Sequence, residues 1–93
     1  MSQDVDQRLP GADLVAAALG DLAAGRETVE SLLVSMAATR LGQLGYPVVE
    51  PFADPERRLW RLLARHDPDS AHGRYNALVR RLVSFQRAAA CAA

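Results

Sequence analysis

Five prolines constrain the fold of this chain more than any other feature, because they stand only at positions 10, 47, 51, 55 and 68. A proline inside a helix removes a hydrogen bond and clashes with the preceding turn, so helices are expected between these positions. The segments between them carry apolar residues at the spacing of an amphipathic helix, and no run alternates like a strand. The sequence therefore predicts an all-α fold.

Local signals at the ends of these segments indicate where the helices begin and stop. Gly25 is expected to end the first helix, and Thr28 is a good N-cap for the second. At Asp54-Pro55 the sequence offers an acceptor side chain at the N-cap and a proline at the first helical position. Helices are thus expected over about residues 12–24, 28–44, 55–66 and 70–90.

The connections between these helices suggest how they pack. Short turns at Gly25 and Pro68 favour antiparallel neighbours, whereas residues 46–53 cannot be helical through two prolines. We expect an extended link there, with Val48, Val49 and Phe52 lying over the bundle. The predicted architecture is a small four-helix bundle of two antiparallel hairpins joined by this Pro-rich link.

The length of the chain sets the number of domains. A chain of 93 residues buries only roughly 60 to 65% of its unfolded surface, so it supports one core. We expect a single domain over residues 1–93, with residues 1–10 as a polar leader. Barrels and dinucleotide-binding folds need far more chain.

Charge is divided unevenly along the chain although its formal sum is zero. Residues 1–50 hold three arginines and seven acids, and residues 51–93 hold eight arginines and four acids. An acidic half with a net charge of −4 is therefore joined to a basic half with a net charge of +4. We expect the two halves to attract each other, within one chain or head to tail between two copies.

Several classes of function find no support in the sequence. The phosphate-binding loop, the Gly-rich dinucleotide motif, the serine elbow and the H-E-x-x-H zinc motif are all absent, so we expect a non-enzymatic protein without a cofactor. Cys91 is the only cysteine, which leaves no disulfide within the chain and favours a cytoplasmic setting. No stretch is apolar enough to suggest a membrane partner, and the lack of Lys and Ile suggests a GC-rich bacterial genome.

Two histidines flank the expected turn at Pro68 and suggest two interpretations, a metal site and a nuclease. His66 and His72 offer only two ligands near solvated acids, and we expect no metal there. Arg61 with His66, and Arg65 with His72, match R-x4-H and R-x6-H patterns that resemble the arginine–histidine motif of helical ribonucleases of the HEPN type. That resemblance implies an arginine that holds phosphate and a histidine that transfers a proton.

The arginines of the basic half are the main candidates for binding. Phe85 lies off the apolar stripe of the last helix, where a partner or a second copy could cover it, or where a wider core stripe would include it. The leading interpretation is a small adaptor or regulatory protein that binds another protein or itself. Its predicted partner-binding residues are Arg57, Arg58, Arg61, Arg65, Arg80, Arg81, Phe85 and Arg87.

A nucleic-acid-binding regulator is the alternative that uses the same arginines together with Arg74. Because the chain contains no Lys, every surface cation must be arginine, so the enrichment says less about phosphate than usual. The proline-interrupted join also lacks the short turn of a helix-turn-helix. A small helical ribonuclease stands as the third interpretation.

Overall fold

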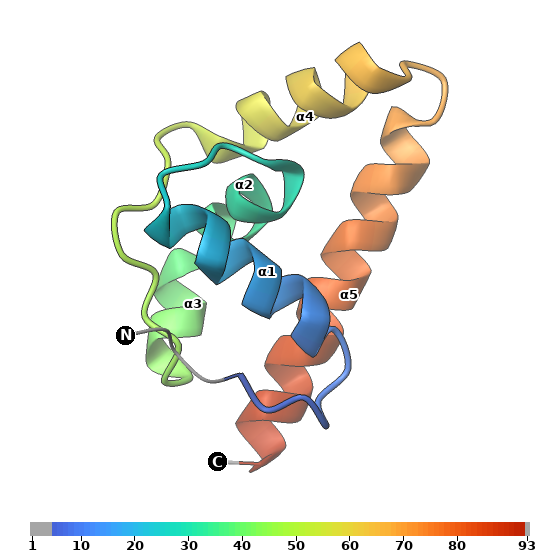
Figure 1. The fold of residues 1–93 in the computed structure, drawn as a ribbon. Coiled ribbons are helices and arrows are strands. Elements are labelled where there is room, and N and C mark those ends of the chain that lie inside the picture. Colours follow the sequence, from blue (N-terminus) through green and yellow to red (C-terminus); the bar gives the residue numbers. More distant parts are fainter. Residues whose placement is uncertain (1–4, 93) are drawn as a thin grey trace.

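The computed structural model describes residues 5–92 and shows an all-α protein (Figure 1). Over this range it contains no strand, which confirms the predicted fold class. It also has one helix more than the four that the sequence predicts. The helices are α1 (Ala12–Ala23), α2 (Val29–Met36), α3 (Ala38–Gln43), α4 (Pro55–His66) and α5 (Ala71–Ala92). Residues 1–4 of the expected polar leader lie outside the described range.

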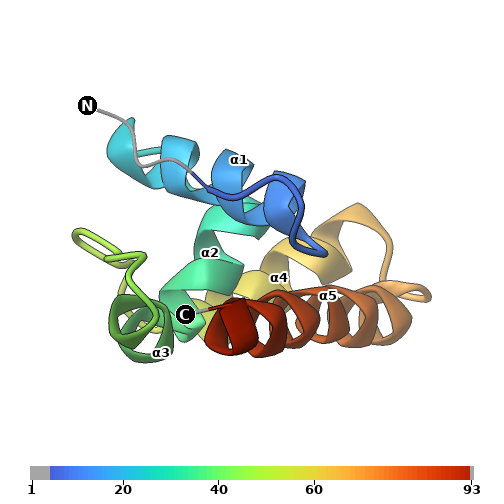
Figure 2. The ribbon, with the colours of Figure 1, turned by 90° about the horizontal axis from the view of Figure 1, so that it is seen from below.

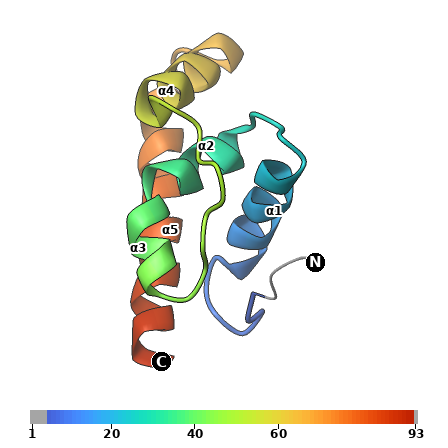
Figure 3. The same cartoon turned by 90° about the vertical axis from the view of Figure 1, so that its left-hand side faces the viewer.

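The helix expected over residues 28–44 is broken, so that prediction is wrong. Ala37 leaves the helical region with φ −106° and ψ 20°, and α3 runs in a different direction from α2 (Figure 3). The Ser35 hydroxyl donates to the Ser31 carbonyl oxygen at 2.7 Å, a bond that bends helices. The apolar stripe nevertheless continues across the break, since Leu33 and Leu41 are both fully buried.

The turn between α1 and α2 follows the sequence signals closely. Gly25 has φ 73°, a left-handed conformation that suits glycine after a helix end. Thr28 caps α2 through a reciprocal pair of hydrogen bonds with Ser31: Thr28 Oγ1 accepts from the Ser31 N–H, and Ser31 Oγ accepts from the Thr28 N–H. The Thr28 hydroxyl also donates to Asp21 at 2.8 Å, which ties α2 to α1.

The link over residues 46–53 is non-helical, as expected, but it covers the core with only part of its apolar side chains. Val48 and Phe52 pack against the core, and the Phe52 N–H donates to the Ser35 hydroxyl at 3.1 Å. Val49 is 71% exposed, so the expectation that it lies over the bundle is wrong. Consecutive side chains of an extended segment point to opposite sides, and here Val48 takes the inner one.

The start of α4 keeps its proline but not the predicted cap. Pro55 occupies the first turn, as expected, whereas Asp54 has φ 51° and makes no capping hydrogen bond with its side chain. A capping side chain usually reaches the helix from an extended backbone, which Asp54 does not have. Its carboxylate instead lies 3.4 Å from Arg57.

The core is centred on α2, which makes its most extensive contacts with α1 and α4. Figure 2 shows α1 on one side of α2, with α4 and α5 on the other. From the turn at residues 67–70, α4 and α5 diverge, and α5 continues past α1 (Figure 1). The described helices thus agree only in part with two antiparallel hairpins. None of them combines the length and apolar character needed to cross a bilayer.

Candidate functional site

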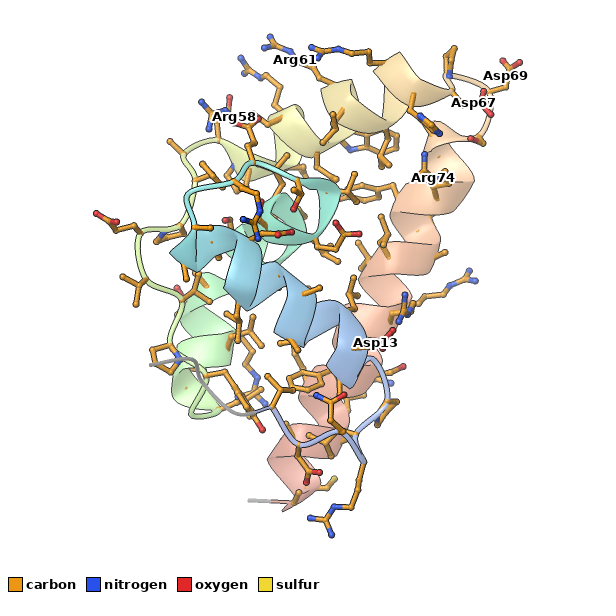
Figure 4. The ribbon with its side chains drawn as sticks, viewed as in Figure 1. Asp13, Arg58, Arg61, Asp67, Asp69 and Arg74 are labelled. Carbon is orange, nitrogen blue, oxygen red and sulfur yellow. The ribbon has the colours of Figure 1, made fainter. Side chains whose placement is uncertain are left out.

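The outward side of α4 carries a row of three exposed arginines. Leu59 and Leu63, four residues apart, are fully buried on the inward side. Arg57, Arg61 and Arg65 repeat at the same spacing and are all exposed, and Figure 4 shows Arg61 pointing away from the other helices. Residues four apart lie on one face of a helix, so these arginines form a continuous strip. We refer to Arg57, Arg61 and Arg65 as the α4 ridge.

Arg58 is adjacent in sequence but belongs to the packing of the molecule. Its Nη1 lies 3.6 Å from Glu27, in the turn before α2, and its guanidinium lies over the Phe52 ring, 5.9 Å from the centroid. These contacts join α4 to the α1–α2 turn and to the link. Arg58, a predicted partner-binding residue, thus has an acid and an aromatic ring of the same chain as neighbours, although its side chain is still 40% exposed.

Intramolecular acids neutralise little of the α4 ridge. Arg57 has Asp54 as a neighbour, yet both side chains are mostly exposed, and such surface pairs contribute little. Arg61 and Arg65 form no ion pair with any residue in the range 5–92. Arg61 and Arg65 therefore present positive charge to solvent without a paired acid among residues 5–92.

The predicted arginines of α5 divide in a similar way. Arg81 donates to both carboxylate oxygens of Asp13, at 3.0 and 3.2 Å, and so connects α5 to the start of α1. This hydrogen bond is the main cause that lowers the pKa of Asp13 below its usual value. Arg80 and Arg87 are exposed and make no ion pair within the described chain.

The unpaired arginines of α4 and α5 do not form one surface. Arg80 and Arg87 lie roughly 14 and 24 Å along α5 from its first residue, at 1.5 Å per residue. Because the two helices diverge from their turn, these positions are progressively further from α4 (Figure 1). The sequence predicts one arginine-bearing face across both helices, but the unpaired arginines lie in separate patches. The α4 ridge is the densest of these patches.

Phe85 is fully buried, so its prediction as a partner-binding residue is wrong and the wider core stripe is right. The ring meets Tyr46 edge to face, with centroids 5.3 Å apart. Leu82 and Ala89 are buried on the same side of α5. Tyr46 of the link and Gly11, just before α1, lie against Phe85, so this side of α5 is buried in addition to the stripe that the sequence shows.

The two histidines have separate surroundings. His72 stacks on Trp60, which in turn stacks on Tyr75 with ring centroids 4.5 Å apart. The Tyr75 hydroxyl donates to Glu56 at 3.0 Å, and burial followed by this carboxylate raises the pKa of Tyr75. His66 lies in the last turn of α4. In the range 5–92 no group of three or more His, Cys, Asp or Glu is placed to hold a metal ion.

In the sequence, Arg74 is one of several phosphate-binding candidates, and nothing in its spacing sets it apart. In the structure this side chain is partly buried, and its Nη1 atom is buried without a hydrogen-bond partner. Its distance along the chain from the elements that enclose it explains why spacing could not single it out.

Comparisons with models of protein families, with curated proteins and with solved structures give no match for this chain.

Proposed function

We propose that this protein is a small non-enzymatic adaptor that binds an acidic segment of another protein along the α4 ridge. The observation that carries the proposal is the pair Arg61 and Arg65, exposed on the outward face of α4 with no acid of the described chain beside them. Guanidinium groups donate in a planar fork that matches carboxylates, and Arg is enriched at protein interfaces. The single cysteine supports a cytoplasmic setting for this adaptor.

The distribution of acids favours a different protein over a second copy as the partner. In the acidic half, four described carboxylates already form ion pairs with arginines of the same chain: Asp6, Asp13, Asp21 and Glu27. Glu30 and Glu50 are the described acids of that half outside such pairs, and Glu30 is partly buried. Within that half, Glu50 is thus the one described acid that is exposed and outside an ion pair, so the acidic half offers little free negative charge to the ridge of another copy.

The size of the ridge favours a protein segment over nucleic acid. From Arg57 to Arg65 the ridge is about 12 Å long, the rise of eight helical residues. A helix that carries acids at every fourth position would match this spacing. Proteins that bind duplexes through the backbone usually neutralise more phosphates than three arginines can.

The proposal is tested with a fluorescently labelled helical peptide that carries Glu at three positions four residues apart. Binding is measured by fluorescence anisotropy for the unmodified protein and for Arg61→Glu/Arg65→Glu. Because this double variant places acids opposite acids, we expect it to weaken binding by at least roughly tenfold. Arg80→Glu/Arg87→Glu is the matched control, with the same change in charge on exposed, unpaired arginines, and should bind as the unmodified protein does.

Three outcomes would contradict the proposal. The first is no binding of the peptide at low salt, and the second is an equal loss in both double variants. The third is tight, steeply salt-dependent binding of a random DNA duplex through the same arginines, which supports the nucleic-acid alternative. Light scattering on the same samples separates a further case, since a doubled mass that the peptide does not change would indicate a homodimer.

A further inference from the structure

A cleft of about 300 Å³ lies where the start of α2 meets the end of α4 and the start of α5. Apolar side chains form one part of its wall, and cationic or polar side chains form another. It is lined by Thr28, Val29, Leu62, His66 and Arg74. The hydroxyl of Thr28 is already used in the cap of α2 and in its bond to Asp21. Arg74 and His66 therefore supply the free polar groups of the cleft.

Arg74 is the unusual member of this group. Its Nη1 atom is buried and has no hydrogen-bond partner, and no acid in the range 5–92 pairs with it. A buried polar atom without a partner costs free energy, and such atoms are rare in native proteins. In Figure 4 Arg74 lies below the turn that carries Asp67 and Asp69. Asp67 is engaged within that turn, where it accepts the N–H of Asp69 at 3.2 Å.

The position of Arg74 near the amino end of α5 makes an anion beside it electrostatically favourable. It is the fourth residue of the helix, and the first turn holds no acid. The amino end of a helix carries partial positive charge, so a cation there is electrostatically unfavourable and an anion is favourable. An anion bound by Arg74 would therefore pair with its partly buried guanidinium and lie near the positive end of the helix.

We propose that this cleft binds a small monocarboxylate, with its carboxylate on Arg74 and its apolar part against Val29 and Leu62. One guanidinium balances one negative charge and can donate two parallel hydrogen bonds to one carboxylate. The apolar wall suits an aromatic or branched aliphatic group, and the cavity is at the small end of ligand sites. Phosphate would bring more charge and more oxygens than these donors satisfy, and it has no apolar part. The site is separate from the α4 ridge.

The proposal is tested by calorimetric titration with benzoate and with benzamide, which has the same shape without the charge. We expect benzoate to bind and benzamide not to bind. Arg74→Met should weaken benzoate binding by roughly ten- to a hundredfold, the effect of losing hydrogen bonds to a charged group. Arg80→Met is the matched control on the same helix and should bind as the unmodified protein does, as should Arg61→Glu/Arg65→Glu.

Three results would overturn the proposal: no binding of benzoate, equal binding of benzamide, or binding of inorganic phosphate in place of benzoate. Circular dichroism reports whether Arg74→Met folds. If it does not, Arg74→Lys keeps the charge and loses the planar fork, and it should still weaken benzoate binding. Full affinity in a folded Arg74→Met sample, or full affinity in Arg74→Lys where Arg74→Met does not fold, would also overturn the proposal.

Discussion

Gly11 and Arg81 approach so closely that a Cβ atom on Gly11 would lie 2.9 Å from the Arg81 carbonyl oxygen. Gly11 has φ 76°, so it combines a left-handed backbone with direct packing on α5. The side chain of the same arginine pairs with Asp13, in the first turn of α1. Backbone and side chain of Arg81 thus both hold the start of α1 against the middle of α5, and they join the acidic half of the chain to the basic half.

This approach predicts that Gly11→Ala destabilises the fold by about 2 to 4 kcal/mol, through left-handed strain plus the clash with α5. Gly25→Ala is a matched control, because Gly25 has φ 73° but open space around its Cβ position. The control should lose only about 1 kcal/mol from strain. Urea denaturation measures both, and equal losses would show that the contact with Arg81 carries no weight.

The ion pair between Asp13 and Arg81 predicts that the stability of the fold decreases at low pH. The hydrogen bond from Arg81 lowers the pKa of Asp13 in the folded chain below its usual 3.8. A carboxyl of this kind stabilises the fold above its unfolded pKa, and that contribution is lost as the pH falls through the folded pKa. Asp13→Asn should therefore lower stability at neutral pH and leave it nearly unchanged at a pH below the folded pKa. Both are read from urea midpoints.

Asp69→Asn provides the comparison for this acid effect, since Asp69 is exposed and forms no ion pair among residues 5–92. Its midpoints should follow those of the unmodified protein at both pH values. If Asp13→Asn also follows them, the ion pair does not contribute to the fold.

Helix positions were predictable where local signals decide them. Pro55 begins α4, and Thr28 and Gly25 bound α2 and α1 as the sequence indicates. The break at Ala37 was not predictable from apolar spacing, because the buried stripe continues across it and the Ser35 hydroxyl beside it also accepts from Phe52, 17 residues away.

The candidate site was predictable only in outline, because contacts between residues distant in sequence decide the rest. Spacing alone places Arg57, Arg61 and Arg65 on one strip of α4. Which arginines stay free depends on acids that are distant in sequence, as with Arg81 and Asp13, 68 residues apart. The burial of Phe85 likewise depends on Tyr46, which no periodicity within α5 can reveal.

The burial of Phe85 predicts that Phe85→Ala lowers the free energy of unfolding by about 3 to 5 kcal/mol, the usual cost of removing a large core side chain. Val49→Ala is the control at an apolar residue that is 71% exposed, and its effect should stay within about 0.5 kcal/mol. Chemical denaturation measures both. If Phe85→Ala left stability unchanged but altered the mass in light scattering, Phe85 would be an interface residue after all.

The surroundings of Tyr75 predict that its hydroxyl ionises at a higher pH than a free tyrosine and that the fold loses stability when it does. Burial is the larger cause that raises its pKa above the usual 10.0, and the hydrogen bond to Glu56 adds to it. A group with a raised folded pKa stabilises the fold below its unfolded pKa, and that contribution is lost as the pH rises through the folded pKa.

In a Tyr46→Phe background, where Tyr75 is the one tyrosine left, ultraviolet absorbance reports its ionisation directly. Glu56→Gln should lower the pKa of Tyr75 only part of the way to 10.0, because burial remains, and Glu50→Gln should not move it. A pKa that stays in place in Glu56→Gln would show that the carboxylate has no influence on the tyrosine, and a full return to 10.0 would show that burial has none.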